Sequence, residues 1–83
     1  MQGMIKVVKK TTLKIIAINV RRIRESYGWT QADLAEEMKR PQPRVSEIEV
    51  ASHPITTDTI DKICDALGID QRTLLTPTKS DSQ

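Results

Sequence analysis

Phenylalanine is absent from the 83-residue sequence, and tryptophan and tyrosine each occur once, so aliphatic side chains must fill any core. A chain of this length forms a single domain with a core of modest size. Its apolar runs span only a few residues, far short of the roughly 18–20 that cross a bilayer. The pattern of a secretory signal, a charged start followed by an apolar block and a cleavage site, is also missing. We therefore expect one domain without a membrane partner.

Cysteine and histidine are equally scarce, with one of each, Cys64 and His53. A lone cysteine cannot form an internal disulfide, which favours a reduced thiol and a cytoplasmic protein. Metal sites need several Cys or His residues at ligand spacing, and catalysis needs a nucleophile beside a base or acids paired in a cleft. The sequence offers neither arrangement. We expect no metal, no cofactor and no enzymatic activity.

The charge is unevenly distributed along the chain, although its net value is only +2. Residues 1–49 hold ten Lys and Arg against six Asp and Glu, whereas residues 50–83 hold three against five. A one-sided basic field is typical of proteins that bind a polyanion. Proteins with neutral partners also carry such imbalances, so this feature alone leaves the partner open.

The spacing of apolar residues predicts a first helix from about residue 13 to residue 27, with Thr11 or Thr12 as its cap and Gly28 at its end. Its inward residues recur at intervals of three and four: Leu13, Ile16, Val20, Ile23 and Tyr27. The same pattern turns a second set outward: Lys14, Asn19, Arg22 and Glu25. Residues 1–10 are interpreted as an N-terminal arm.

The second helix has a sharper start signal. Thr30 is followed three residues later by Asp33, the arrangement of a capping box, in which each side chain accepts the backbone N–H of the other residue. Trp29 and Leu34 flank this box as a hydrophobic staple. The pattern predicts a helix over residues 31–39.

Two prolines mark the start of the third helix. The fixed φ of Pro41 suits the first turn of a helix. Pro43 is tolerated there because the first-turn N–H groups have no intrahelical partners. The helix is predicted over residues 41–50 and buries Val45 and Ile48.

Two further helices complete an all-α domain over residues 11–75. Thr57 is expected to cap the fourth helix, which ends at Gly68, and Asp70 caps a short fifth helix. Their inward residues are Ile60, Ile63, Cys64, Leu67, Leu74 and Leu75. The polar residues 76–83 are interpreted as a disordered tail.

The second and third helices, 31–39 and 41–50, are joined by a very short connection, which forces them to cross steeply. Such a pair must pack on the first and fourth helices, and one face of the third helix then remains in solvent. The major groove of B-form DNA is wide enough to admit a helix. The outward residues that would read bases from it are Gln42, Arg44, Ser46 and Glu47.

These helices resemble the helix-turn-helix of the Xre/Cro-type phage-repressor family. The resemblance rests on two runs, Trp29-Thr30-Gln31-Ala32-Asp33-Leu34-Ala35-Glu36 and Val45-Ser46-Glu47-Ile48-Glu49. It extends over residues 13–75 and includes Arg24, seven residues before Gln31, and the ending Ala66-Leu67-Gly68. It implies a five-helix lambda-repressor-like fold and a regulator that binds double-stranded DNA sequence-specifically, often a repressor.

The resemblance also implies roles for single residues. Gln31 matches a position that contacts a DNA phosphate, and Gln42 and Glu47 match positions that touch base edges. Arg44 and Ser46 lie on the same face, near bases or backbone.

Two further implications concern structure and assembly. Arg24 and Glu49 match a partly buried ion pair that joins the first helix to the third. Family members commonly form homodimers on palindromic operators, through the fifth helix or the residues after it.

The sequence departs from the family pattern at several positions. Lys39 stands where glycine is usual, so either a lysine adopts a positive φ, at roughly 1 kcal/mol, or the turn changes shape. Pro43 offers only apolar contact to a base, and Glu47 would repel nearby phosphates. The loop 51–54 lacks the usual glycine and basic residues. Phosphate anchoring then falls to helix N-termini and to Lys10 and the other arm lysines, Gln31, Arg40 and Arg44.

An alternative function is an antitoxin-like or other protein-interaction module with weak or no DNA binding. The low net charge, Pro43, Glu47 and the charge-poor loop favour it. The run Gln42-Pro43-Arg44-Val45-Ser46 is similar to antitoxin-like members of the family. A toxin or another protein would then be the partner.

Overall fold

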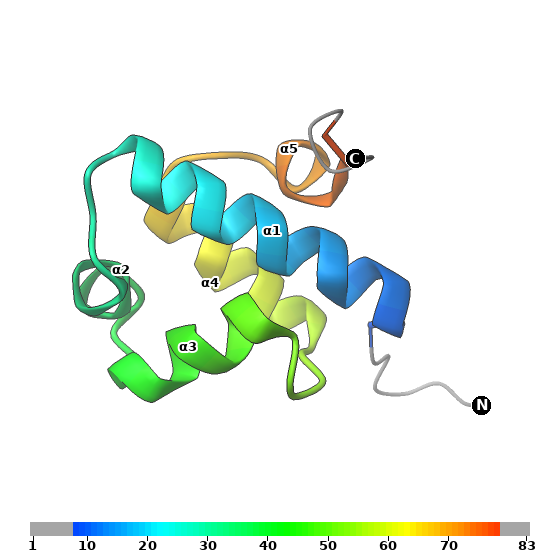
Figure 1. Cartoon of the computed structure of the whole chain (residues 1–83), viewed down its shortest axis with the longest axis horizontal. Coiled ribbons are helices and arrows are strands. Elements are labelled where there is room, and N and C mark those ends of the chain that lie inside the picture. Colours follow the sequence, from blue (N-terminus) through cyan, green and yellow to red (C-terminus); the bar gives the residue numbers. More distant parts are fainter. Residues whose placement is uncertain (1–7, 79–83) are drawn as a thin grey trace.

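The computed structural model describes residues 8–78, and these residues form five helices (Figure 1). They are α1 (Lys10–Ser26), α2 (Gln31–Met38), α3 (Gln42–Val50), α4 (Thr57–Leu67) and α5 (Gln71–Leu75). The all-α, five-helix prediction is confirmed. None of these helices is long and apolar enough to cross a membrane.

The helices enclose one aliphatic core. In Figure 1, α1 runs across the molecule, with α2 and α3 on one side and α5 on the other. Every helix and the loop between α3 and α4 contribute to the core: Leu13, Ile16, Val20, Ile23, Leu34, Ala35, Met38, Val45, Ile48, Ile55, Ile60, Ile63, Cys64, Leu67 and Leu74. Burial raises the pKa of the Cys64 thiol, because the thiolate is disfavoured away from water. Cys64 is therefore a small core residue in this fold.

The start of α2 follows the predicted capping box. Thr30 Oγ1 accepts the N–H of Asp33 at 3.0 Å, and Asp33 Oδ2 accepts the N–H of Thr30 at 2.9 Å. Trp29 packs against the core just before this cap. These contacts fix the direction in which the chain enters α2.

Several other helix starts differ from the prediction by one to three residues. The cap of α4 is Thr56 rather than Thr57, and its side chain accepts the N–H of Thr59. α1 begins at Lys10, after the extended residue Lys9, so Thr11 and Thr12 lie inside its first turn. Lys10 accordingly belongs to a helix and not to an arm. Asp70 caps α5 as predicted, accepting the N–H of Thr73 at 2.8 Å.

Three helices end in left-handed residues. Lys39, after α2, has φ 58° and ψ 45°, so the lysine that replaces the usual glycine does take the strained conformation. Ala51, after α3, has φ 55°, whereas α4 ends at Gly68 with φ 71°. A side chain at such a φ costs about 1 kcal/mol, and only Gly68 avoids that cost.

Two residues of α1 are not placed as the helical pattern predicts. Asn19, expected outside, is fully buried, and its Nδ2 donates to the carbonyls of Leu74 at 2.7 Å and Thr76 at 2.9 Å. Tyr27, expected inside, is 45% exposed, although its hydroxyl donates to the Leu67 carbonyl at 2.6 Å. In both cases a polar group donates to a backbone carbonyl on a segment that is distant in the sequence. The spacing of apolar residues within one helix cannot predict such a contact.

The segments at the two ends of the described chain contact the domain. The N–H of Val8 donates to the Ile55 carbonyl at 3.3 Å, and Val8 packs on the core. At the other end, Asn19 holds Thr76. The predicted tail therefore has an ordered beginning. The rest of the predicted arm and tail, residues 1–7 and 79–83, lies outside the described residues.

Candidate nucleic-acid interface

α2 and α3 bury one face each and leave the rest in solvent. α2 buries Leu34, Ala35 and Met38, whereas α3 buries only Val45 and Ile48. α3 lies at the lower edge of the domain in Figure 1, with no helix below it. Most of its other side chains therefore line an open surface.

A buried ion pair fastens α3 to α1. Arg24 Nε lies 2.6 Å from Glu49 Oε2, and Arg24 Nη2 donates to Glu49 Oε1 at 2.9 Å. The two side chains are only 9% and 3% exposed, and Arg24 Nη1 also donates to the Trp29 carbonyl at 2.7 Å. The hydrogen bond to Glu49, more than any other effect, raises the pKa of Arg24 above its ordinary value. The pair thus joins three segments: α1, α3 and the start of α2.

A chain of amide contacts leads from this pair to the surface. Gln31 Nε2 donates to Glu49 Oε1 at 3.1 Å, which turns Gln31 Oε1 toward α3. That oxygen accepts from Gln42 Nε2 at 2.7 Å. Because a carboxylate can only accept, it fixes which end of the Gln31 amide faces it, and Gln31 in turn orients Gln42. Two predicted DNA-contacting residues therefore form one hydrogen-bonded unit.

The other predicted base-reading residues occupy the same helix. Arg44, Ser46 and Glu47 are partly exposed on α3. Arg44 Nη1 lies 3.4 Å from Glu47 Oε1, and His53 Nδ1 lies 3.8 Å from the same oxygen. His53 was not predicted as part of this surface.

The predicted phosphate contacts are less closely grouped. Arg40 is exposed beside α3 in the turn after α2 and donates to the Lys39 carbonyl at 3.2 Å. Lys10 is exposed in the first turn of α1, where it lines a groove together with Lys14, Ile18 and residues 77–78. Arg40 therefore belongs to the α2–α3 surface, whereas Lys10 belongs to a different part of the molecule.

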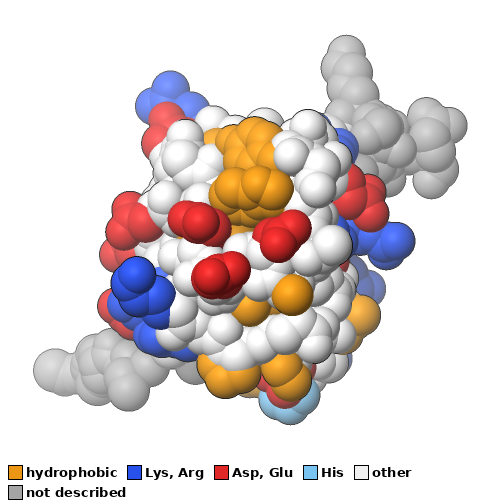
Figure 2. Space-filling model, turned by 90° about the vertical axis from the view of Figure 1, so that its left-hand side faces the viewer, with side chains coloured by type: hydrophobic (Ala, Val, Ile, Leu, Met, Phe, Trp, Pro, Cys, Tyr) orange, Lys and Arg blue, Asp and Glu red, His pale blue; other side chains and the backbone are white. Residues whose placement is uncertain are grey.

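The outer face of α2 has the opposite charge. Its exposed side chains include Asp33, Glu36 and Glu37. Figure 2, which views the molecule from the side that carries α2, shows acidic side chains gathered at the centre and basic ones at the edge. Phosphates cannot approach this face favourably. A nucleic acid would therefore have to meet α3 and the N-terminal end of α2. Within residues 8–78, no three His, Cys, Asp or Glu side chains are grouped so as to hold a metal ion.

Comparison with known proteins agrees with this geometry. A helix-turn-helix family model matches residues 20–70, more than half of the chain, and the chain belongs to this family. Its class is therefore that of helix-turn-helix DNA-binding regulators. No curated protein matches the sequence.

Two solved structures are similar to this chain. A hypothetical transcription factor, NHTF from Neisseria, superimposes with a TM-score of 0.78 at 27% identity, covering 93% of this chain and 90% of that one. The wild-type restriction-modification controller protein C.Esp1396I superimposes with a TM-score of 0.70 at 25% identity, covering 76% of this chain and 81% of that one.

Proposed function

We propose that this protein is a repressor that binds double-stranded DNA sequence-specifically, as a homodimer, with α3 in the major groove. The observation that carries the proposal is the hydrogen-bonded chain from the buried Arg24–Glu49 pair through Gln31 to Gln42. A binding surface benefits when its polar groups are oriented before the partner arrives, because less freedom is lost on binding.

The proposed reading follows from the orientation of Gln42. One N–H of its amide is held by Gln31, which leaves the second N–H and Oε1 for DNA. An amide that donates to N7 and accepts from N6 recognises adenine. Arg44 has the fork that pairs with guanine O6 and N7, and Ser46 can donate to or accept from either kind of base.

Phosphate contacts would position α3 without selecting sequence. We assign them to Gln31, to Arg40 and to the N-terminal end of α2, where backbone N–H groups favour anions. Lys10 is assigned to flanking phosphates, which it would reach from the first turn of α1.

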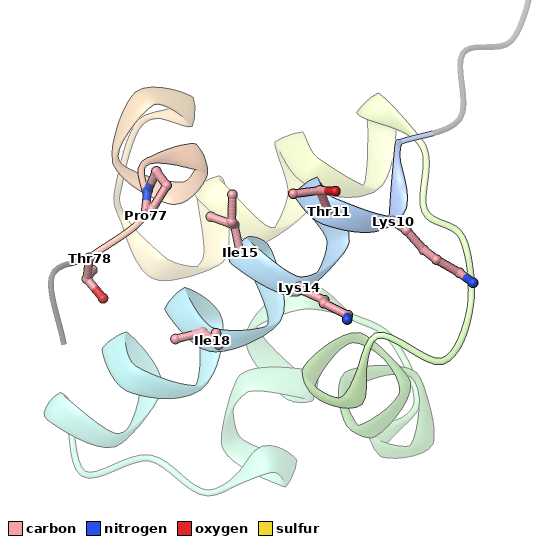
Figure 3. Close-up of a pocket in the computed structure, with 7 residues that line it drawn as sticks. All are labelled: Lys10, Thr11, Lys14, Ile15, Ile18, Pro77 and Thr78. Carbon is pink, nitrogen blue, oxygen red and sulfur yellow. The ribbon is translucent and has the colours of Figure 1, made fainter. Parts of the chain in front are cut away.

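A groove away from α2 supports the proposed homodimer. It runs between α1 and the segment after α5, and its walls are Lys10, Thr11, Lys14, Ile15, Ile18, Pro77 and Thr78 (Figure 3). Ile18 is 42% exposed there and adds apolar surface to the groove together with Ile15 and Pro77. A second copy that covers this groove would bury apolar surface, and two recognition helices would then address half-sites about 34 Å apart.

Selection of bound sequences from random DNA duplexes tests the proposal. We expect a palindrome, and we expect Gln42→Ala to relax the preference at one position of each half-site by a factor of about ten. A matched control is Gln71→Ala, because Gln71 is an exposed glutamine on α5 whose amide donates to Asp61 of α4 and not to α3. Wild-type protein that enriches no sequence would contradict the proposal.

A protein-interaction module with weak or no DNA binding, such as an antitoxin, is the second candidate. The acidic outer face of α2 favours it, because that surface does not suit a nucleic acid. Light scattering and co-purification distinguish the two functions. The second function would be favoured if the protein forms a stoichiometric complex with a different protein and causes no salt-sensitive mobility shift of any DNA duplex.

A further inference from the structure

The exposed face of α3 carries a carboxylate that an arginine and a histidine side chain approach. Glu47 Oε1 lies 3.4 Å from Arg44 Nη1 and 3.8 Å from His53 Nδ1. Arg44 and Glu47 are each about one-third exposed, so both can meet a ligand of α3. A carboxylate is repelled by a polyanion. Its presence at the centre of this face therefore calls for a role other than attracting DNA.

The backbone after α3 is bent so that His53 reaches this carboxylate. Ala51 has a left-handed φ of 55°, a conformation that residues with a side chain rarely adopt. The N–H of Ser52 then donates to the Glu47 carbonyl at 3.2 Å, which turns the loop back over α3. Ser52 Oγ lies 2.9 Å from His53 Nδ1. The loop thus brings a hydroxyl and an imidazole to the Glu47 side of the helix.

We propose that Glu47 is a positioning residue for Arg44 and not a base reader, with His53 of the loop after α3 as the second neighbour of its carboxylate. This inference rests on the proposed function, since it concerns how Arg44 discriminates between bases. It differs from the sequence-based expectation that Glu47 itself contacts a base edge, and the variants below distinguish the two roles.

DNA offers an arginine side chain two kinds of partner, the phosphates and the base edges. A free guanidinium can swing to the nearest phosphate, which increases affinity for every sequence alike. A guanidinium held on one side by a carboxylate keeps its remaining N–H groups in a fixed plane, as pairing with guanine O6 and N7 requires. Glu47 also repels phosphates from the space around Arg44. It therefore lowers affinity for DNA in general and raises the preference for one base pair.

The test compares four proteins by sequence selection and by titration: wild type, Arg44→Ala, Glu47→Gln and the double variant. The base pair read by Arg44 is the one at which Arg44→Ala loses its preference. We expect Glu47→Gln to reduce discrimination at that same base pair about tenfold, within the range for one bidentate contact. Affinity for an unrelated duplex should rise, and the slope of log affinity against log salt should steepen by about 0.9 as Arg44 gains a phosphate.

Two further variants separate positioning from a general effect of charge. Glu36→Gln removes the same charge from the outer face of α2 and should leave discrimination unchanged. His53→Ala should reduce discrimination at the Arg44 base pair by about threefold, since the carboxylate loses one of its two neighbours. In the Arg44→Ala background, Glu47→Gln should have no further effect on discrimination, because coupled residues are not additive.

The outcomes that would overturn the inference differ from those that would overturn the proposed function. If Glu47→Gln relaxes the preference at a different base pair, and the double variant with Arg44→Ala shows the same loss, then Glu47 reads a base itself. If discrimination is unchanged in Glu47→Gln while the wild type remains selective, then Glu47 is only a surface charge. Both results leave the proposed function intact, whereas a wild type that selects no sequence overturns both proposals.

Discussion

α3 and α4 are similar in length but are held in the domain by different means. α4 buries four of its eleven residues in the core, and all four are apolar or weakly polar. α3 buries only Val45 and Ile48 of its nine residues and is attached in addition through the Glu49 carboxylate. The comparison suggests how a helix can display a polar face and still keep a fixed position. A buried polar anchor at its C-terminal end replaces part of the missing apolar contact.

The C-terminal ends of α3 and α4 also differ, in the residue that adopts the left-handed conformation. α4 ends at a glycine that adopts the left-handed conformation freely, whereas α3 ends at Ala51, which adopts it under strain. That strained turn is also the one that carries Ser52 and His53 toward Glu47. The helix with the proposed function thus holds the less favourable backbone, as is common at functional sites.

The largest expected effect is on the polar anchor. Glu49→Ala should lower the free energy of unfolding by about 3–5 kcal/mol, because it leaves the buried Arg24 charge without its partner. Urea denaturation at constant salt measures the change. The double variant Arg24→Met with Glu49→Leu should recover most of the loss, since apolar replacement of a buried pair is often neutral. A loss below 1 kcal/mol for Glu49→Ala would mean that α3 does not depend on this anchor.

The apolar side of the comparison is tested at Ile63, which is fully buried in α4. Ile63→Ala should cost about 3 kcal/mol through lost burial and the cavity that remains. Because Ile63 is fully buried in α4 and is not part of the exposed face of α3, we expect the folded variant to keep wild-type DNA selectivity at low temperature. A change in selectivity at matched folded fraction would show that α4 also shapes the recognition face.

The residue types at the two left-handed helix ends can be exchanged by mutation. Ala51→Gly should raise the free energy of unfolding by about 1 kcal/mol, and Gly68→Ala should lower it by a similar amount. At Gly68 an added Cβ would meet no atom within 4 Å, so backbone strain is the only cost. Thermal and chemical denaturation of both variants check the signs. If Ala51→Gly is destabilising, the side chain of Ala51 contributes packing that outweighs the strain.

The smallest expected effect is a pH dependence at α5. Hydrogen bonds from Thr73 hold the pKa of the Asp70 carboxyl below its ordinary value of 3.8. Because the folded chain binds this proton less tightly than the unfolded chain, the cap contributes fully above pH 3.8, and its contribution is lost as pH falls through the folded pKa. NMR signals of α5 should therefore shift in a transition that lies below pH 3.8. In Asp70→Asn that low-pH transition should be missing.

Local signals were enough to predict much of the fold. The Thr30–Asp33 box and the apolar spacing of α4 act within a few residues, so they can be recognised without knowledge of the tertiary structure. The five helices and their approximate bounds follow from such signals. The Arg24–Glu49 contact spans 25 residues and was expected only because the sequence resembles a known family.

The features that sequence reasoning missed depend on distant or unusual backbone. Asn19 was assigned to solvent because its partners, the carbonyls of Leu74 and Thr76, are 55 and 57 residues away. The approach of His53 to Glu47 depends on a left-handed turn at Ala51, and alanine gives no sign of such a turn. The Gln31–Gln42 contact required the actual crossing of α2 and α3. In each case the side chain was visible in the sequence, but its partner was not.

The buried amide of Asn19 also affects how the groove beside α1 would meet another molecule. By holding the carbonyls of Leu74 and Thr76, it fixes the path of the chain into Pro77 before any encounter takes place. One wall of the groove is therefore already in its final shape in the isolated protein. The conformational entropy cost of ordering that wall is met during folding. Association with another molecule therefore does not carry this cost and can proceed as contact between two rigid surfaces.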